Sequence, residues 1–507
     1  MDDMQEKATG TVPEGQGNTG ITEQAAETTA EITKRPWYKV PVITIPAILA
    51  LLVMVYIFLR TVYTSMLRYN VIEGINSPFI GLRNYENIRT DWLVTAVFNT
   101  IGIRLLTLLA CSGLAAAMCV LYRKMEKSGP ILTAACLWLI PVGIPAALIG
   151  APVMNAVQAP NAFTCALAYL AGSGLQTLGI FCFAAGIFAY LKKNPFHGLL
   201  AAVLAWLLKN IGLNAMDAGI HTRIPVSLLT DERNFLSYMS AGTAHSAALC
   251  VVKIVLQVAI GTVAAVLICR RIQRKGLVEK TTRAEMILIP AAVLCVALAN
   301  ILYEATGGIA DAIAKSIACS LLVALGGGAA GGLIAWSFVR LLKGASGRLF
   351  VMIALVLSAA MSCLMEQYLL VSHLELWGKL PLIQALFASF DGRVILLVVI
   401  LALILRFKTG SRPVGLFLSL ALLAGACTWG GIVSAMIYDS ADANSVGMLF
   451  YTQIWSNHIV ERIPGDIESG IVSRETLNMI MAVPPLLMGI GAAFLMKKAF
   501  KNIPEKE

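Results

Sequence analysis

The stretch "VPVITIPAILALLVMVYIFL", Val40 to Leu59, contains no charged residue and follows the basic segment "KRPWYK". A helix rises about 1.5 Å per residue, so about twenty apolar residues cross the hydrocarbon core of a bilayer, which is about 30 Å thick. A cleaved signal peptide has a shorter apolar core and a small-residue cleavage site, and these features do not follow the basic residues here. The stretch therefore predicts a helix that stays in the membrane as an anchor.

Apolar runs of similar length recur along the whole chain of 507 residues. The sequence is 58% hydrophobic and 13% charged, whereas soluble proteins carry about 25% charged residues. Windows of about twenty residues indicate twelve candidate spans, centred near residues 50, 108, 143, 178, 206, 256, 295, 328, 360, 400, 425 and 486. We predict an all-α, polytopic membrane protein with about twelve transmembrane helices.

The Lys and Arg residues gather in every second loop between these spans. The loops hold more than half of the 39 Lys and Arg residues and read "KRPWYK", "YRKMEK", "LKKNPFH", "CRRIQRKGLVEKTTR", "RLLKGASGR", "RFKTGSR" and "MKKAFK". Loops rich in Lys and Arg stay in the cytoplasm, so the pattern predicts a multi-pass protein of the cytoplasmic membrane with both termini cytoplasmic. The net charge of +10 is then a sign of topology, and no nucleic-acid partner is expected.

Composition divides the chain into four parts. Residues 1–33 are polar, contain no aromatic residue, and cannot bury enough apolar surface to fold, so we predict a disordered cytoplasmic tail. Residues 34–275 and 276–501 are predicted to form two six-helix halves with one shared orientation, as parallel repeats have. Residues 502–507 are a second cytoplasmic tail.

The loop after the first span carries a definite pattern, "SPFIGLRNYENI", Ser77 to Ile88. It resembles the first outer loop in the transmembrane subunits of maltose-type carbohydrate ABC importers. In that family a Phe-x-Gly-Leu-x-Asn-Tyr segment precedes an Asn-Thr pair that opens the next span. The matching positions are Phe79, Gly81, Leu82, Asn84, Tyr85, Asn99 and Thr100.

Further segments are similar to the same family. Residues 234–261 are similar to the outer loop and sixth span of that subunit. Residues 314–341 and 475–501 are similar to the second and last spans of the companion permease subunit. The resemblance covers most of residues 36–501 and implies a type I importer fold in which two normally separate permease chains are fused.

One feature of the family is missing from the sequence. The family's permeases couple to ATP hydrolysis through a cytoplasmic loop between the fourth and fifth spans, where a short helix that starts with Glu-Ala-Ala sits in a cleft of the ATPase. The corresponding loops here are "LKKNPFHG", Leu191 to Gly198, and "RFKTGSRPVG", Arg406 to Gly415. Each is too short for a two-turn helix and its connections, and neither contains Glu-Ala-Ala.

Polar residues inside the predicted spans are candidates for a substrate pathway, because ionisable groups at membrane depth are costly unless they are paired or wetted. The candidates are Lys253 and Glu366, with Gln176 and Gln257 as uncharged donors and acceptors. The alternative is a structural salt bridge in which Glu366 pairs with Lys253 or Lys209 across the halves.

Trp429 and Tyr438, with Tyr169, are candidates for the aromatic platform of a sugar site. Residues of the aromatic belt at the membrane interface are the alternative interpretation. The run "GGGAAGG", Gly326 to Gly332, lies inside an apolar span and predicts close helix packing in preference to a phosphate cradle. A functional hinge or part of a pathway is the alternative interpretation.

The sequence contains no P-loop, HExxH or GxSxG motif, and none of its 11 cysteines forms a CxxC pair. His221 and His245 flank an acidic outer loop, but their spacing matches no metal site. We therefore expect no enzyme activity, no cofactor and no metal.

We expect a permease component that moves a carbohydrate or related polar solute across the cytoplasmic membrane as part of an ABC-type importer. The resemblance implies an ABC ATPase and an extracytoplasmic solute-binding protein as partners, the latter on the polar outer loops 214–241 and 438–475. One alternative is a non-transporting scaffold or regulatory subunit, which the missing coupling loops favour. Another is an ion- or proton-driven transporter with Glu366 or Asp217 as its titrating acid.

Overall fold

The computed structural model describes residues 42–69, 73, 76–86, 90–126, 128–143, 174–210, 283–342, 345–360, 364–390, 413–429, 445–450 and 474–500, together with positions 394, 397, 438 and several between 248 and 267. By compactness the chain divides into Met1–Val42 and Ile43–Glu507. The predicted tails, 1–33 and 502–507, lie outside the described residues.

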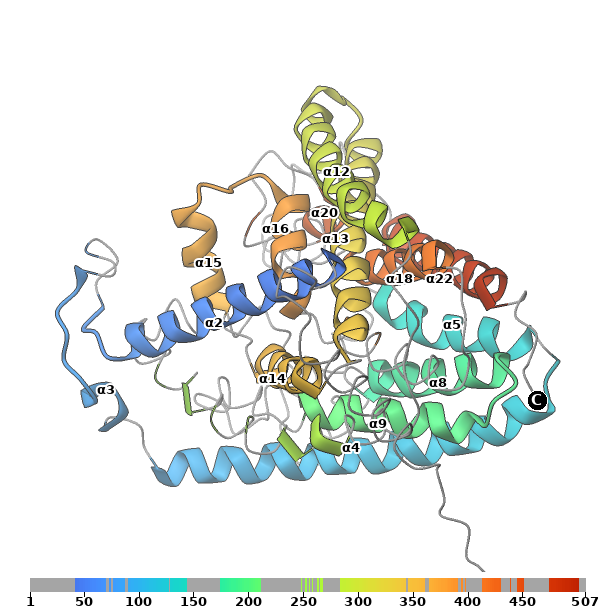
Figure 1. The fold of residues 1–507 in the computed structure, drawn as a ribbon, viewed down its shortest axis with the longest axis horizontal. Coiled ribbons are helices and arrows are strands. Elements are labelled where there is room, and N and C mark those ends of the chain that lie inside the picture. Colours follow the sequence, from blue (N-terminus) through green and yellow to red (C-terminus); the bar gives the residue numbers. More distant parts are fainter. Residues whose placement is uncertain are drawn as a thin grey trace, which may run out of the picture. The chain divides into compact units, whose positions relative to one another are not determined.

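The described part of the second unit is helical (Figure 1). Its longer helices are α2 (Ile45–Ser65), α4 (Thr90–Lys124), α5 (Gly129–Gly143), α8 (Leu175–Tyr190), α9 (Pro195–Asn210), α12 (Arg283–Ala305), α13 (Ala312–Leu341), α14 (Ala345–Ala360), α15 (Leu364–His373), α16 (Leu380–Phe387), α18 (Pro413–Thr428) and α22 (Arg474–Phe500). The short elements are η2 (Val42–Thr44), α3 (Arg83–Glu86), η6 (Thr306–Gly308), η7 (Ala388–Phe390) and α20 (Val446–Phe450). Each predicted span centre falls inside one of these helices, except those near residues 256 and 400, which lie outside the described residues.

Several of these helices have the length and composition of membrane spans. Within the described ranges, five segments qualify: Ile45–Ser65, Arg104–Lys124, Met286–Gly308, Ile313–Leu341 and Met479–Ala499. Shorter apolar helices are Gly129–Leu139, Leu175–Tyr190, Pro195–Leu207, Leu380–Phe390 and Pro413–Thr428. The chain is a helical, multi-pass membrane protein, as predicted, while the count of twelve spans stays a prediction.

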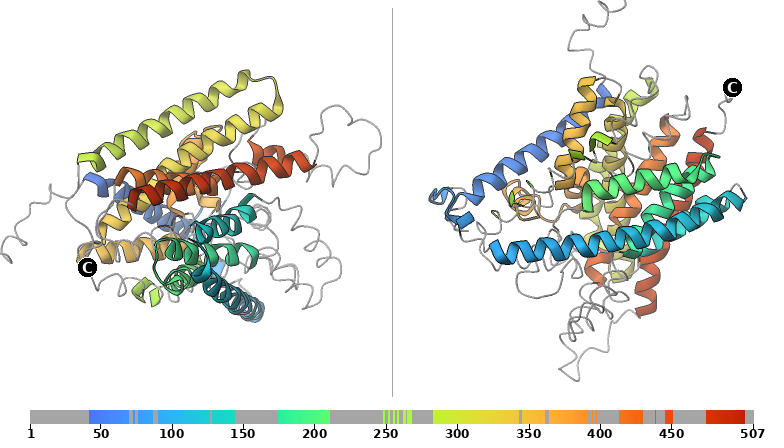
Figure 2. Two further views of the ribbon diagram at one scale, coloured as in Figure 1. Left: turned by 90° about the vertical axis from the view of Figure 1, so that its right-hand side faces the viewer. Right: turned by 90° about the horizontal axis from the view of Figure 1, so that it is seen from below.

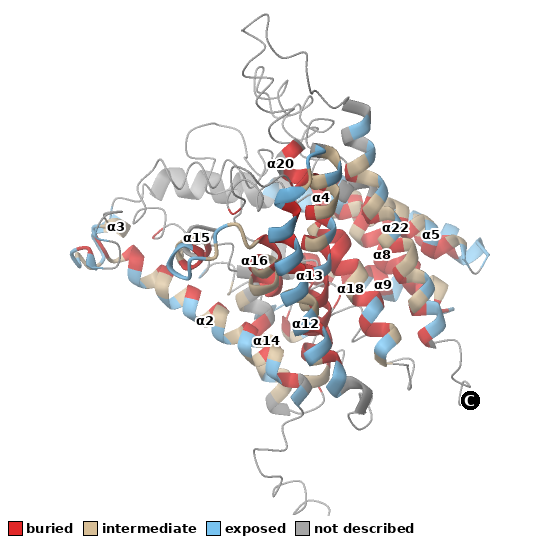
Figure 3. Ribbon diagram, turned by 90° about the horizontal axis from the view of Figure 1, so that it is seen from above, coloured by how far each residue is buried: buried red, intermediate tan, exposed pale blue. Residues whose placement is uncertain are grey.

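The helix α13 lies at the centre of the packing in the second half. It starts where the side chain of Asp311 accepts a hydrogen bond of 2.7 Å from the backbone N–H of Ala314, which caps the first turn. It packs against α18, α12 and α16, and 67% of its apolar window is buried, against 22–28% for the other four candidate spans (Figure 3). It forms an antiparallel hairpin with α12 through η6 (Figure 2).

The run Gly326–Gly332 lies where α13 meets α18. A Cβ atom added to Gly328 would lie 2.5 Å from the carbonyl oxygen of Ala421. From the facing helix, a Cβ atom on Gly425 would lie 2.7 Å from the carbonyl oxygen of Ala324. Backbones approach this closely only where small residues line both helices. The predicted packing role of the run is therefore confirmed.

In the first half, glycine likewise allows the close approach of α5, α8 and α9. A Cβ atom on Gly179 of α8 would lie 3.0 Å from Cα of Trp138, and one on Gly186 would lie 2.7 Å from the carbonyl oxygen of Pro130. Gly198 of α9 lies against the backbone of Ala184. Glycine at these positions lets three apolar helices pack as a tight layer.

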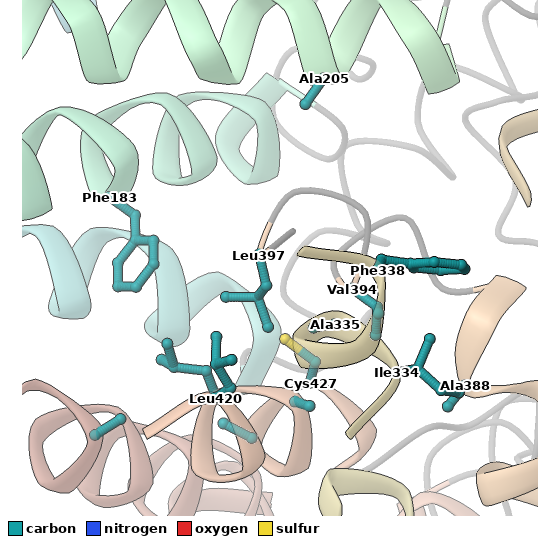
Figure 4. Packing of buried hydrophobic residues seen from close by; sticks show 14 of the residues in the cluster. Phe183, Ala205, Ile334, Ala335, Phe338, Ala388, Val394, Leu397, Leu420 and Cys427 are labelled. Atoms are coloured by element: carbon teal, nitrogen blue, oxygen red, sulfur yellow. The ribbon is translucent and has the colours of Figure 1, made fainter. Parts of the chain in front are cut away.

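Helices from the two predicted halves contact one another. The helix α22 packs against α18 and also against α5, and α2 contacts α13, α14 and α15. Within the second half, Ser419 of α18 donates a hydrogen bond of 2.8 Å to the carbonyl oxygen of Ala492 on α22. Apolar side chains from both halves share one core, in which Phe183, Leu420 and Cys427 lie (Figure 4).

Candidate functional site

The segment that resembles the permease signature folds back on the end of α2. Residues Leu67 and Phe79 pair as an antiparallel β-bridge. The backbone N–H of Arg68 donates to the carbonyl of Pro78 at 2.8 Å, and that of Ile80 donates to the carbonyl of Met66 at 2.9 Å. These bonds close the loop directly after the last turn of the helix.

The Asn-Tyr pair of the signature supplies the side chains that hold this loop. The Asn84 amide donates to the carbonyl oxygens of Ser65 and Leu67, at 2.8 Å and 2.9 Å. The hydroxyls of Tyr85 and Ser65 are 2.6 Å apart. Carbonyls at a helix C-terminus lack partners within the helix, so Asn84 satisfies groups that the end of α2 leaves open.

The apolar residues of the signature have a different role. Gly81 adopts a φ of +66°, a left-handed conformation that glycine takes without a Cβ penalty. Phe79 and Leu82, on either side of this turn, are 63% and 62% exposed. Asn99 and Thr100 lie within α4, which begins at Thr90. The structure therefore brings the first five signature residues together and places the Asn-Thr pair on the next helix.

Trp429 directly follows α18 and is buried. Its indole N–H donates a hydrogen bond of 3.0 Å to the carbonyl oxygen of Ile480 on α22. The side chain therefore joins two helices in this conformation. Its role as a sugar platform stays a prediction.

Tyr438 is also buried, and its ring stacks on Phe387 with 6.3 Å between the ring centroids. The backbone N–H of Gly378 donates to the carbonyl oxygen of Tyr438 at 3.4 Å. Its hydroxyl is buried without a hydrogen-bond partner among the described residues. A buried hydroxyl that lacks a partner is costly, so Tyr438 is less well satisfied than Trp429, whose indole N–H is bonded. Tyr169 lies outside the described residues.

The other predicted pathway residues do not meet in the described part. Gln176 lies in the first turn of α8 and is exposed. Glu366 lies on α15, and its side chain is outside the described residues, as are Lys253 and Gln257. The predicted pairing of Glu366 with Lys253 stays a prediction.

Sequence reasoning missed several buried polar contacts. Gln367 is buried beside the predicted Glu366. The Ser320 hydroxyl of α13 accepts a hydrogen bond of 2.8 Å from the backbone N–H of Val446, at the start of α20. A single polar residue in an apolar run gives no signal of its partner, because that partner is set by tertiary packing.

Comparisons with protein-family models, curated proteins and solved structures gave no match.

The connection between α8 and α9, where the resemblance implies a coupling helix, is a tight turn. The helix α8 ends at Tyr190 and α9 begins at Pro195, so only residues 191–194 connect them (Figure 1). Lys192 adopts a φ of +57°, and the Asn194 side chain accepts a hydrogen bond of 3.2 Å from the backbone N–H of Phe196. This loop has no room for a coupling helix, as its length predicted. In the corresponding loop of the second half, residues 406–412 lie outside the described residues, and Pro413 begins α18.

Among the described residues, no group of three or more His, Cys, Asp or Glu side chains is arranged to hold a metal ion. None of the described cysteines takes part in a disulfide; these are Cys111, Cys119, Cys136, Cys182, Cys295, Cys319 and Cys427.

Proposed function

We propose that this chain is a permease-type component that moves a carbohydrate or related polar solute across the cytoplasmic membrane as part of an ABC-type importer. The observation that supports this function best is the construction of the signature loop. Its Asn84 and Tyr85 satisfy groups at the end of α2, while Phe79 and Leu82 stay exposed. A segment with both features presents a fixed apolar surface at the end of a membrane span.

The contacts between the two halves suit a rocking mechanism. The helix α22 packs against α18 of its own half and α5 of the other half. At the contact between α22 and α5, Gly489 lies against the side chain of Leu139, so a glycine and not a long side chain of α22 faces the other half. In the proposed mechanism the halves rock against each other around a midplane cavity, which opens alternately to each side. Lys253, Glu366, Gln176 and Gln257 are the proposed polar contacts along that pathway.

The proposed partners are an ABC ATPase at the cytoplasmic face and a solute-binding protein on outer loops 214–241 and 438–475. Both termini are proposed to be cytoplasmic, because more than half of the Lys and Arg residues lie in the loops on that side.

A second function, a non-transporting scaffold or regulatory subunit, is favoured by one specific observation. The turn between α8 and α9 is four residues long, from Leu191 to Asn194. An ATPase that recognises a coupling helix finds none there. A permease-derived bundle can keep its packing and its outer loops after it has lost this contact.

Affinity purification of the full chain from its native membrane, in a mild detergent, distinguishes the two functions. The bound proteins are identified by mass spectrometry and their ATPase activity is measured, with an unrelated tagged multi-pass protein purified in parallel as control. The importer function predicts a stoichiometric ATPase whose activity one sugar-binding protein stimulates. Intact complexes that hold other membrane proteins and no ATPase would refute the importer and support the scaffold.

A further inference from the structure

Basic residues from three helix ends gather at one end of the bundle. The helix α4 ends in Arg123 and Lys124, the turn after α8 holds Lys192 and Lys193, and the last turn of α22 holds Lys497 and Lys498. These six residues, called the basic cluster below, come from both predicted halves of the chain. All are exposed except Lys193, which is half-buried.

Arg123 holds the end of α4 against the turn between α8 and α9. Its Nη2 donates a hydrogen bond of 2.9 Å to the Oδ1 atom of Asn194. Its guanidinium carbon lies 5.2 Å from the centroid of the Phe196 ring, which is cation–π distance. These two contacts fix the guanidinium on a surface that also carries Lys192 and Lys193.

Lys497 brings the end of α22 to the same place. Its Nζ atom lies 5.9 Å from the centroid of the Tyr190 ring, and Tyr190 is the last residue of α8. The lysines of α22 therefore lie beside the helix end that leads into Lys192 and Lys193.

The positive charge of the basic cluster favours the binding of an anion. Like charges in one place raise the local electrostatic potential and attract counter-ions. The segment after α4 contributes one carboxylate to this surface, that of Glu126, two residues after Lys124. Arg123 and the lysines also differ in the bonds they form. A guanidinium presents a planar fork that suits phosphate, while an ammonium acts as a point charge.

An apolar shelf adjoins the basic cluster. Phe196 and Leu200 lie one turn apart on α9 and are 37% and 36% exposed, so they share one face of the helix. The ring of Phe196 lies next to Arg123. A ligand that contacts both needs a phosphate and, next to it, a hydrocarbon chain.

We propose that the basic cluster binds the headgroup of an anionic phospholipid, whose acyl chain lies along Phe196 and Leu200. The position suits this ligand, because Arg104–Lys124 and Met479–Ala499 are candidate spans and their last residues reach the headgroup layer. Basic pockets between transmembrane helices on the cytoplasmic side bind such headgroups. The bound lipid bridges the two halves at α4, α8 and α22. This inference does not depend on whether the chain transports a solute.

Lipid-dependent thermal stability of the full-length chain in detergent tests the proposal. The probes are phosphatidylglycerol, phosphatidylcholine with the same acyl chains, and inorganic phosphate. We expect phosphatidylglycerol to raise the unfolding temperature and the other two to leave it unchanged. A double variant, Lys192→Gln with Lys193→Gln, should raise the lipid concentration for half-maximal stabilisation about fivefold for each lysine removed, because a lysine near an anionic surface contributes about 1 kcal/mol.

The matched control is a second double variant, Arg68→Gln with Arg83→Gln, which removes the same charge from the loop after α2. It should respond to phosphatidylglycerol as the unmodified chain does. If the Lys192 and Lys193 variant does not fold, Lys498→Gln on α22 replaces it and should weaken the lipid response about fivefold.

Four results would overturn the proposal. Equal stabilisation by phosphatidylcholine would mean that the headgroup charge is not recognised. Equal stabilisation by inorganic phosphate would show a phosphate site without a lipid. An equal loss of stabilisation by phosphatidylglycerol in both double variants would show that the lipid does not bind at the basic cluster. The absence of any shift in the unfolding temperature of the unmodified chain would show the same. The basic cluster would then be a docking surface for an acidic protein.

Discussion

Replacement of Gly328 by alanine tests the contact between α13 and α18 directly. The added Cβ atom would lie 2.5 Å from the carbonyl oxygen of Ala421 and 3.0 Å from the Cα atom of Gly425. Carbon atoms make their best contacts at about 3.5–4.0 Å, and both obstacles are backbone atoms that cannot rotate away. The two helices must therefore move apart to admit a single methyl group.

The size of the effect follows from two opposing contributions. Overpacking a dense interior costs about 1–3 kcal/mol. Alanine gains about 0.5–1 kcal/mol over glycine inside a helix. The free energy of unfolding should therefore fall for Gly328→Ala, by about 1 kcal/mol and at most about 2.5 kcal/mol.

The control is Gly113→Ala on α4, where an added Cβ atom would meet nothing within 4 Å. This variant should be neutral or more stable by up to about 1 kcal/mol. Thermal unfolding in detergent is followed with a thiol-reactive dye, because Cys319 of α13 and Cys427 of α18 are buried and become reactive when the helices separate. Equal unfolding temperatures for the Gly328 variant and the unmodified chain, or an equal loss in both variants, would refute the tight packing.

Three further substitutions test single contacts. Asn84→Ala removes both hydrogen bonds to the end of α2 and should cost about 1–3 kcal/mol, seen as faster proteolysis of the loop at Arg83; an unchanged cleavage rate would contradict the assigned role. Asn194→Ala should lower the unfolding temperature through the loss of a helix cap worth about 1 kcal/mol, whereas Asn194→Asp should keep it, and equal losses would argue against capping. Trp429→Phe leaves the carbonyl of Ile480 without its donor and should cost about 1–3 kcal/mol in thermal unfolding; a stable variant would show that the hydrogen bond is dispensable.

The helices and their places could be predicted because apolar length is a local property of the sequence. The run from Val40 to Leu59 predicted a span, and the structure has α2 from Ile45 to Ser65. The packing role of Gly326–Gly332 could also be predicted, since a small-residue stripe inside an apolar helix has few other uses. What the stripe could not reveal was its partner, the stretch of α18 around Ala421 and Gly425.

The contacts of the candidate residues could not be predicted, because they join segments far apart in the chain. The signature pattern singled out Asn84, but its bonds to the carbonyls of Ser65 and Leu67 depend on how the loop folds back. Trp429 was predicted as a candidate for a sugar platform, with a residue of the aromatic belt as the alternative. Its bond to Ile480, 51 residues later, exists only once α18 and α22 pack together.

The turn between α8 and α9 constrains any model of ATP coupling. Three features hold it: the left-handed backbone at Lys192, the cap from Asn194, and the Arg123 side chain that bonds that cap. A two-turn helix needs about seven residues, almost twice the length of the whole connection from Leu191 to Asn194. An ATPase that binds at this connection would therefore contact the turn and the neighbouring helix ends themselves. Those helix ends carry the basic cluster, so an ATPase and an anionic lipid would compete for one surface. An ATPase that co-purifies with this chain should accordingly be displaced by phosphatidylglycerol and not by phosphatidylcholine, and simultaneous binding of both would place the ATPase elsewhere on the bundle.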